Sequence, residues 1–255
     1  MLPSLLSWAA AAPQVTTEIA NEGPLRRRLV SDDADVVLLV ASEQEGIVGP
    51  CGCSIEPLGG LDRMASVVRS MRRRTPNTPI LTLNVGGLLA STSRDTDAAM
   101  VQASPFDGLL ATAAERPGVE ATPDLPWLSA NLDFLPAFRT FSAGDHTVGV
   151  TGVTGPDAVA AVRRVLPQLA KVDLRVVLAH RVGTQVPELL ALPGVDVVVE
   201  AGGFRARYGP YTDEDSVWVR SWQATPVLGE LRLWLDEEGI ERAVYRWVRL
   251  DAKLD

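Results

Sequence analysis

The chain has 255 residues, of which 46% are hydrophobic and 22% are charged, and its formal net charge is −8. This composition is that of a globular protein with enough apolar residues for a sizeable core, and it excludes a disordered, collagen-like or coiled-coil chain. The acidic balance argues against nucleic acid as a partner, because a phosphate-binding surface needs an excess of cations.

The N-terminal segment, residues 1–14, is largely apolar and contains a run of alanines before Pro13. It resembles a short secretory signal with a small-residue cleavage site, although the basic residues that normally open such a segment are missing. We expect residues 1–29 to be an N-terminal tail or a signal-like segment, followed by a single domain over residues 30–255. Export would make the protein periplasmic or secreted, and the alternative is a cytoplasmic protein. No transmembrane segment is predicted, because no apolar run approaches about 18 residues.

Four apolar runs have the continuous pattern of strands that are buried on both faces. They cover residues 35–41, 79–83, 174–179 and 195–199. Further strands are predicted at residues 127–130 and 148–153, and helices at residues 61–74, 94–103, 155–169 and 186–191. The segment 105–126 is ambiguous, and a helix is predicted there around residues 109–115.

After Gly203 the helical patterns stop. Residues 216–222, 228–236 and 241–249 alternate like antiparallel strands, and Gly239 marks the last hairpin turn. Because each buried strand needs cover on both faces, we predict an α/β fold with four layers, an α/β/β/α sandwich of two mixed sheets packed face to face. In such folds the functional side chains collect in the loops that follow the strands.

One loop is the most informative segment of the chain. Residues 50–65 begin Pro-Cys-Gly-Cys and continue into Gly-Gly-Leu-Asp-Arg, and they resemble the first metal-site loop of the calcineurin-like metallophosphoesterases, in the 5'-nucleotidase branch. Four more segments resemble motifs of that family in the same order, at residues 81–87, 176–183, 192–199 and 228–239. The resemblance covers residues 30–251 and implies the same four-layer fold, with metal-dependent hydrolysis of phosphate esters as the activity.

The resemblance also implies a set of metal ligands, and most of the corresponding positions hold other residue types. The family's D-x-H pair falls on Glu43 and Glu45, and its two D-x-G-D aspartates fall on Asn84 and Gly87. Its strand-end histidine falls on His180, and its G-H-x-H pair falls on Gly202 and Phe204. Of the family's imidazoles only the strand-end one is kept, as His180. Asn84 stands where the resemblance implies a bridging aspartate, and a neutral amide cannot supply the charge that holds two cations together.

Two functions follow from this mapping. The first is a catalytically degenerate binding or structural protein in which His180 is a relic. The second is an active metal-dependent hydrolase of phosphate esters, such as nucleotides, with an unusual carboxylate-rich site. The candidate metal ligands are Glu43, Glu45, Asn84 and His180, and we expect no metal or one weakly bound divalent ion, Mn, Mg or Zn. We predict that Glu43, Asn84, His180 and Gly202 converge at one rim.

Cysteines and tryptophans leave further alternatives open. Cys51 and Cys53 are the chain's two cysteines, and they are inert thiols, a soft-metal pair or a redox pair near the same rim. Trp218, Trp222, Trp234 and Trp247 form either core beneath a sheet edge or a platform on which a ligand stacks. No motif identifies a partner, and a protein partner is compatible with the sequence.

Overall fold

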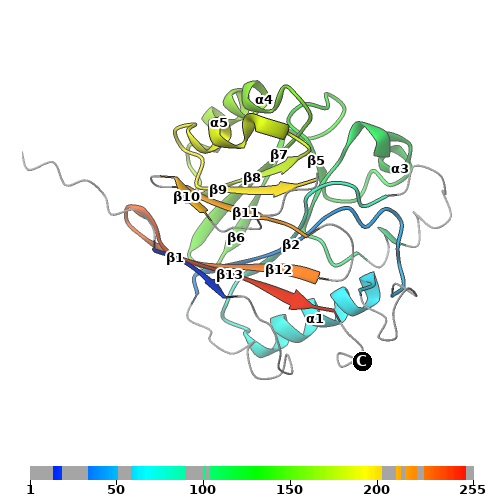
Figure 1. Ribbon diagram of the computed structural model, residues 1–255, viewed down its shortest axis with the longest axis horizontal. Helices are drawn as coiled ribbons and strands as arrows, with labels where there is room; N and C mark the ends of the chain where they lie inside the picture. The colour runs from blue at the N-terminus through cyan, green and yellow to red at the C-terminus, as the bar shows by residue number, and fades with distance from the viewer. Residues whose placement is uncertain are drawn as a thin grey trace, which may run out of the picture.

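The strands form two sheets in this computed structural model, which describes residues 14–18, 34–50, 59–89, 100–101, 104–202, 211–213, 216–222 and 227–250 (Figure 1). The first sheet has the order β1-β13-β12-β2-β3-β4-β5 and the second the order β10-β11-β9-β8-β7-β6. The first consists of β1 (Gln14–Glu18), β2 (Val36–Ala41), β3 (Ile80–Asn84), β4 (Gly108–Leu110), β5 (Trp127–Leu128), β12 (Val227–Asp236) and β13 (Gly239–Arg249). The second consists of β6 (Phe138–Ala143), β7 (His146–Thr154), β8 (Leu174–His180), β9 (Val197–Ala201), β10 (Tyr211–Asp213) and β11 (Ser216–Arg220).

Both sheets are mixed, as the sequence predicted. In the first, β2, β3, β4 and β5 are parallel, whereas β12 runs antiparallel to both β2 and β13. In the second, β7, β8, β9 and β11 are parallel, and β6 and β10 join the two edges in the antiparallel sense. The parallel strands end at a common edge of each sheet, which is where loop side chains can meet.

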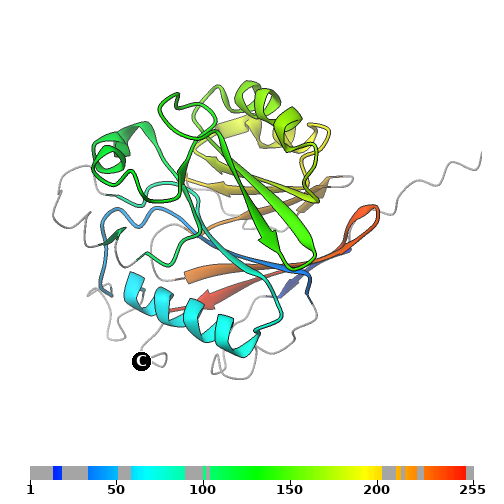
Figure 2. The same ribbon diagram turned by 180° about the vertical axis from the view of Figure 1, so that it is seen from behind.

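The two sheets pack face to face over a shared apolar core. Alternate residues of β2, such as Leu38, point into this core and meet residues of the second sheet such as Leu178. The intervening residue Leu39 points outward, against Met64 of helix α1 (Leu61–Arg74). On the far side, Val177 packs under the helices α4 (Ala158–Val165) and α5 (Val186–Leu190). Figures 1 and 2 show α1 below the first sheet and α4 and α5 above the second, so the fold is the predicted four-layer sandwich.

The ambiguous segment 105–126 differs from its prediction. Residues 108–110 form β4 rather than part of a helix, followed by the 3₁₀ turn η2 (Ala113–Glu115) and helix α3 (Arg116–Ala121). Leu109 and Leu110 point to opposite faces of the first sheet, one toward the outer core and the other between the sheets. A short apolar run has the same appearance in a buried strand and in a buried helix, so the sequence pattern could not separate them.

Three other elements differ from those predicted from the sequence. The predicted helix at 155–169 is α4 followed by the 3₁₀ helix η3 (Leu166–Leu169), in whose first turn Pro167 lacks the amide that a continuing α-helix needs. Strand β11 was expected beside the C-terminal strands, but it lies in the second sheet, where it is antiparallel to β10 and parallel to β9. Strand β1 pairs in parallel with β13 and precedes the expected domain start at residue 30.

The remaining predicted elements are present with small shifts of their ends, except the helix at 94–103. That helix lies largely outside the described residues, and Met100 and Val101 are its helical part within them. Among the helices that the structure describes, none combines the length and apolarity needed to cross a bilayer.

Candidate functional site

The ends of four parallel strands bring the predicted site residues to one rim. Asn84 is the last residue of β3, His180 is the last of β8, and Glu43 and Gly202 follow β2 and β9. The two sheets meet here, since the Nε2 atom of His180 lies 3.5 Å from the Oε1 atom of Glu43. Asn84 joins them because its Oδ1 atom accepts a hydrogen bond from Gly86, and an added Cβ at Gly86 would meet the His180 ring.

Glu43 is the central side chain of the rim, and its carboxylate is 1% exposed. Its Oε1 atom accepts hydrogen bonds from the Nε and Nη2 atoms of Arg181, at 3.2 and 2.7 Å. The His180 ring and then Arg181 hold the pKa of Glu43 below its ordinary value of 4.5, against the opposite effect of burial. Glu43 is therefore an ionised carboxylate whose charge is matched by a cation of the same chain.

Arg181 did not stand out in the sequence. Its backbone has a positive φ of 52° and its amide donates to the carbonyl of Ala201 at 2.8 Å. Its side chain passes close to Gly202, where an added Cβ would lie 2.4 Å from the Arg181 Cγ atom. The one signal that could have identified it is a cationic residue directly after the strand-end histidine.

Asn84 is fully buried, and both polar atoms of its amide are engaged. The Nδ2 atom donates to the Oε1 atom of Gln44 at 2.6 Å, and the Oδ1 atom accepts from the Gly86 amide at 2.9 Å. The second bond is the turn-capping contact typical of asparagine after a strand. Asn84 thus ties the loop after β3 to the loop after β2.

The loop that follows β3 packs tightly against these side chains. Gly86 has a φ of 90°, and an added Cβ there would lie 2.8 Å from the His180 ring. Gly87 has a φ of 70°, and an added Cβ there would lie 3.0 Å from the Glu43 Cα atom. Position 87 corresponds to the second aspartate of the resemblance, and the contact with Glu43 leaves little room for such a side chain.

A second buried carboxylate, Glu115, holds this loop from behind. It is 4% exposed and accepts hydrogen bonds from the backbone amides of Gly87, Leu89 and Thr112 at 3.3, 2.8 and 2.9 Å. The sequence analysis did not single out Glu115. The sequence feature that could have identified it is the Thr-Ala-Ala-Glu run at residues 112–115, which has the pattern of a helix capping box. The structure shows that capping box between Thr112 and Glu115.

Glu45 does not join this cluster. In an extended loop Glu43 and Glu45 would point the same way, because alternate residues of an extended chain share a face. Both have a positive φ, 52° and 46°, so the chain turns here and the alternation is lost. Glu43 is buried whereas Glu45 is exposed. Three other candidates, Phe204, Cys51 and Cys53, lie outside the described residues.

The four tryptophans do not form a single platform. Trp222 and Trp247 are in edge-to-face contact with ring centroids 4.5 Å apart. Trp234 packs toward the α1 side and stacks under the guanidinium of Arg242 at 4.3 Å, whereas Trp218 packs against the core beneath α4 and α5. Core and surface packing accounts for these side chains better than a shared stacking surface.

Solved structures of known proteins share this architecture. The sulfate thiohydrolase SoxB of Thermus thermophilus has a TM-score of 0.72 at 15% identity, over 86% of this chain and 57% of that one. A 5'-nucleotidase precursor from Thermus thermophilus has a TM-score of 0.72 at 17% identity, over 86% and 55% of the two chains. The NAD nucleotidase of Haemophilus influenzae has a TM-score of 0.66 at 16% identity, over 85% and 50%.

This chain has the calcineurin-like metallophosphoesterase fold. It spans a little over half the length of the first two of those solved structures. No family model matches the sequence, and no curated protein matches it significantly. At these identities the likeness establishes the fold of the metallophosphoesterases.

The resemblance implies two divalent cations at this rim. The described residues do not fit such a pair: both amide atoms of Asn84 are engaged, Glu43 is paired with Arg181, and glycine occupies positions 87 and 202. Within the described ranges, no three His, Cys, Asp or Glu side chains gather around a common point that could hold a metal ion.

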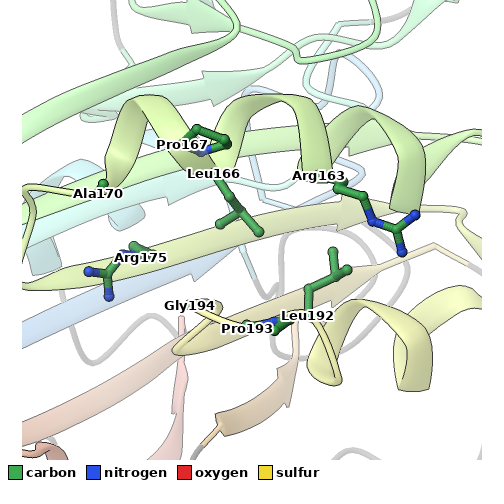
Figure 3. Close-up of a pocket in the computed structure, with 8 residues that line it drawn as sticks. All are labelled: Arg163, Leu166, Pro167, Ala170, Arg175, Leu192, Pro193 and Gly194. Atoms are coloured by element: carbon green, nitrogen blue, oxygen red, sulfur yellow. The ribbon is translucent and has the colours of Figure 1, made fainter.

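A separate groove lies away from the rim (Figure 3). It has a volume of about 570 Å³ and runs between the α4–η3 helices and the loop before β9, with Leu166 and Leu192 between Arg163 and Arg175. Arg175 is near the start of β8 and His180 at its end, so about 16 Å of strand separates the groove from the rim. Arg175 is itself paired with Asp196 at 3.1 Å.

Proposed function

We propose that this chain is a catalytically degenerate protein with the metallophosphoesterase fold, acting as a binding or structural protein and not as a hydrolase. The observation that carries the proposal is the ion pair between Arg181 and Glu43, 2.7 Å long, at the rim where the resemblance implies metals. A carboxylate already neutralised by a guanidinium attracts a divalent cation weakly, because the two cations compete for one charge.

Chemistry supports the same conclusion. Two-metal hydrolysis depends on cations that stabilise both the attacking and the leaving oxygen, and on a bridging carboxylate that holds those cations close together. Asn84 offers a neutral amide at the bridging position, and that amide is already bonded to Gln44 and Gly86. A fold that keeps its layers but lacks these charges can still present the loops of the rim to a partner.

The test is a combined metal and activity assay of the purified protein. We expect less than one equivalent of metal per chain after incubation with Mn²⁺ and gel filtration. We also expect no hydrolysis of a phosphomonoester, a phosphodiester or a nucleotide above that of the His180→Ala variant. Turnover by the unaltered protein that a chelator and His180→Ala both abolish would contradict the proposal.

An active hydrolase is the second candidate, with Glu43, Glu45, Asn84 and His180 as its carboxylate-rich site. One observation favours it: the Oε2 atom of Glu43 and the Nε2 atom of His180 are buried and have no hydrogen-bond partner among the described residues. Unpartnered carboxylate and imidazole atoms are what a divalent cation binds. The same assay decides between the two candidates, because only this one predicts metal-dependent turnover.

The apolar N-terminal segment supports export, to the periplasm or beyond the cell, as a proposal on location. The alternative is the cytoplasm. Sequencing the N-terminus of the protein recovered from each cell fraction tests this, since export with cleavage predicts a chain that lacks its first residues in the exported fraction.

A further inference from the structure

We propose that the guanidinium of Arg181 takes the place of a metal ion at the rim, as a covalently attached counter-ion to Glu43 that joins the two sheets. This inference rests on the metal centre being degenerate, and it adds a role for a residue outside the implied ligand set. It also predicts a latent cation site that becomes available when Arg181 is removed.

The first support is the burial of the carboxylate. The Glu43 side chain is 1% exposed, and an ionised carboxylate at such a position needs a partner of opposite charge. Among the described residues, Arg181 and His180 lie within ion-pairing distance of it, at 2.7 and 3.5 Å. A guanidinium is a permanent cation, whereas an imidazole is a cation only when protonated, so the arginine is the fixed counter-ion.

The second support is that the backbone is arranged around this arginine. Arg181 adopts a φ of 52°, a left-handed conformation that L-residues other than asparagine and aspartate rarely adopt. Its amide is anchored on the Ala201 carbonyl at 2.8 Å, which directs its side chain across the rim toward the first sheet. A disfavoured conformation persists where the surrounding contacts outweigh it, and the Glu43 pair is such a contact.

The third support is that the Arg181 side chain occupies the space that a side chain at position 202 would need. The resemblance assigns a histidine ligand to this position, where the chain has glycine. An added Cβ at Gly202 would lie 2.4 Å from the Arg181 Cγ atom and 3.3 Å from its Nε atom. Because position 202 has no side chain, the Arg181 side chain can pass it and reach Glu43. The chain therefore lacks the implied ligand at position 202 and has the guanidinium in its place.

Removing the guanidinium should therefore uncover a cation site. Without Arg181, the buried Glu43 carboxylate keeps only the His180 ring within ion-pairing distance among the described residues. A divalent ion such as Mn²⁺ binds carboxylate oxygen and imidazole nitrogen, so it can restore the charge balance that the arginine supplied.

The experiment measures the thermal unfolding of full-length protein in EDTA and in millimolar Mn²⁺. The variants are Arg181→Met, Glu43→Gln and the double variant, with Arg163→Met as the matched control because Arg163 is an exposed arginine away from the rim. We expect the unaltered protein and the control to have the same Tm in both buffers. Because the Arg181 side chain is itself 60% exposed, Arg181→Met should unfold about 2–4 °C lower in EDTA, and Mn²⁺ should restore part of the loss.

The double variant separates charge compensation from lost packing. Because it removes the carboxylate together with the guanidinium, its Tm should lie above that of Arg181→Met and should not respond to Mn²⁺. If Arg181→Met does not fold, recovery of folded double variant supports the proposal and its failure to fold contradicts it. An Arg181→Met variant as stable as the unaltered protein and indifferent to Mn²⁺ would overturn the proposal. Phosphoesterase turnover of the unaltered protein bears on the degenerate-enzyme proposal alone, so the two failures are distinguishable.

Discussion

Arg181 follows β8 of the second sheet, and its Nη2 atom lies 2.7 Å from the Oε1 atom of Glu43, which follows β2 of the first sheet. The two residues are 138 positions apart in the sequence. This single contact connects the rims of both sheets and places a fixed positive charge where a metallophosphoesterase fold is expected to hold cations.

Gly202→Ala should destabilise the protein by about 2–4 kcal/mol, because alanine meets both an unfavourable φ and the side chain of Arg181. The φ of Gly202 is 83°, and the added Cβ would lie 2.4 Å from the Arg181 Cγ atom. Urea unfolding measures the loss. Gly183→Ala is the matched control, since Gly183 has a φ of 65° and nothing within 4 Å of its added Cβ, so it should lose only about 1 kcal/mol. Equal losses of stability in the two variants would show that the Arg181 side chain can move away from the added methyl group without destabilising the protein.

Asn84→Asp should lower stability by about 2–4 kcal/mol, because it buries a carboxylate and removes a donor. The Nδ2 atom of Asn84 donates to Gln44 at 2.6 Å, and the residue is 0% exposed. Chemical denaturation in EDTA gives the value. Asn131→Asp serves as the control because it loses a donor bond of 2.6 Å, to the Thr154 carbonyl, at a half-buried position where solvent reduces the penalty. A stabilised Asn84→Asp protein in EDTA would contradict this account of Asn84.

Glu115→Gln should lower stability by about 1–3 kcal/mol, since an ionised carboxylate accepts from backbone amides more strongly than a neutral amide does. Glu115 accepts from the amides of Gly87, Leu89 and Thr112, and glutamine would turn an NH₂ group toward at least one of them. Thermal and urea unfolding both report the change. Glu120→Gln is the control: its ion pair with Arg116 is 56% exposed on the Glu120 side, and losing it should change stability by less than about 0.5 kcal/mol. Similar losses in the two variants would argue against a special role for Glu115.

Stability should depend on pH through Glu43. Its pKa in the folded protein lies below the ordinary value of 4.5, so its contribution is present above about pH 4.5 and is lost as the pH falls through the folded-state pKa. Urea unfolding between pH 7 and pH 3 should therefore show a smaller decline for Glu43→Gln than for the unaltered protein. Burial raises the pKa of Asp196, which acts in the opposite direction, but both proteins contain Asp196, so its effect cancels in the comparison. Parallel pH profiles would mean that Glu43 is not held ionised by its neighbours.

Local patterns in the sequence were enough to determine the layers of this protein. The run at residues 36–41 is buried on both faces, and the helix at residues 61–74 has one apolar stripe, so each has to be covered by other elements whatever the details. Chemistry-bearing residues at strand ends could likewise be placed at one rim, because parallel strands end at a common edge. These conclusions depend on periodicity within a few residues, which a single sequence displays directly.

Tertiary structure alone decided which side chains meet at that rim. No local pattern distinguishes Glu43 from Glu45. Both residues have a positive φ, so the chain turns there, and the Glu43 side chain is buried whereas Glu45 is exposed. Likewise, β11 pairs in the antiparallel sense with β10, but its parallel pairing with β9 on the other side has no signal in its own sequence. The contact between Arg181 and Glu43 depends on the relative position of two sheets and on the space left by Gly202. Such contacts result from the packing of segments that are distant in the sequence, so the residues next to Arg181 or Glu43 in the chain do not predict them.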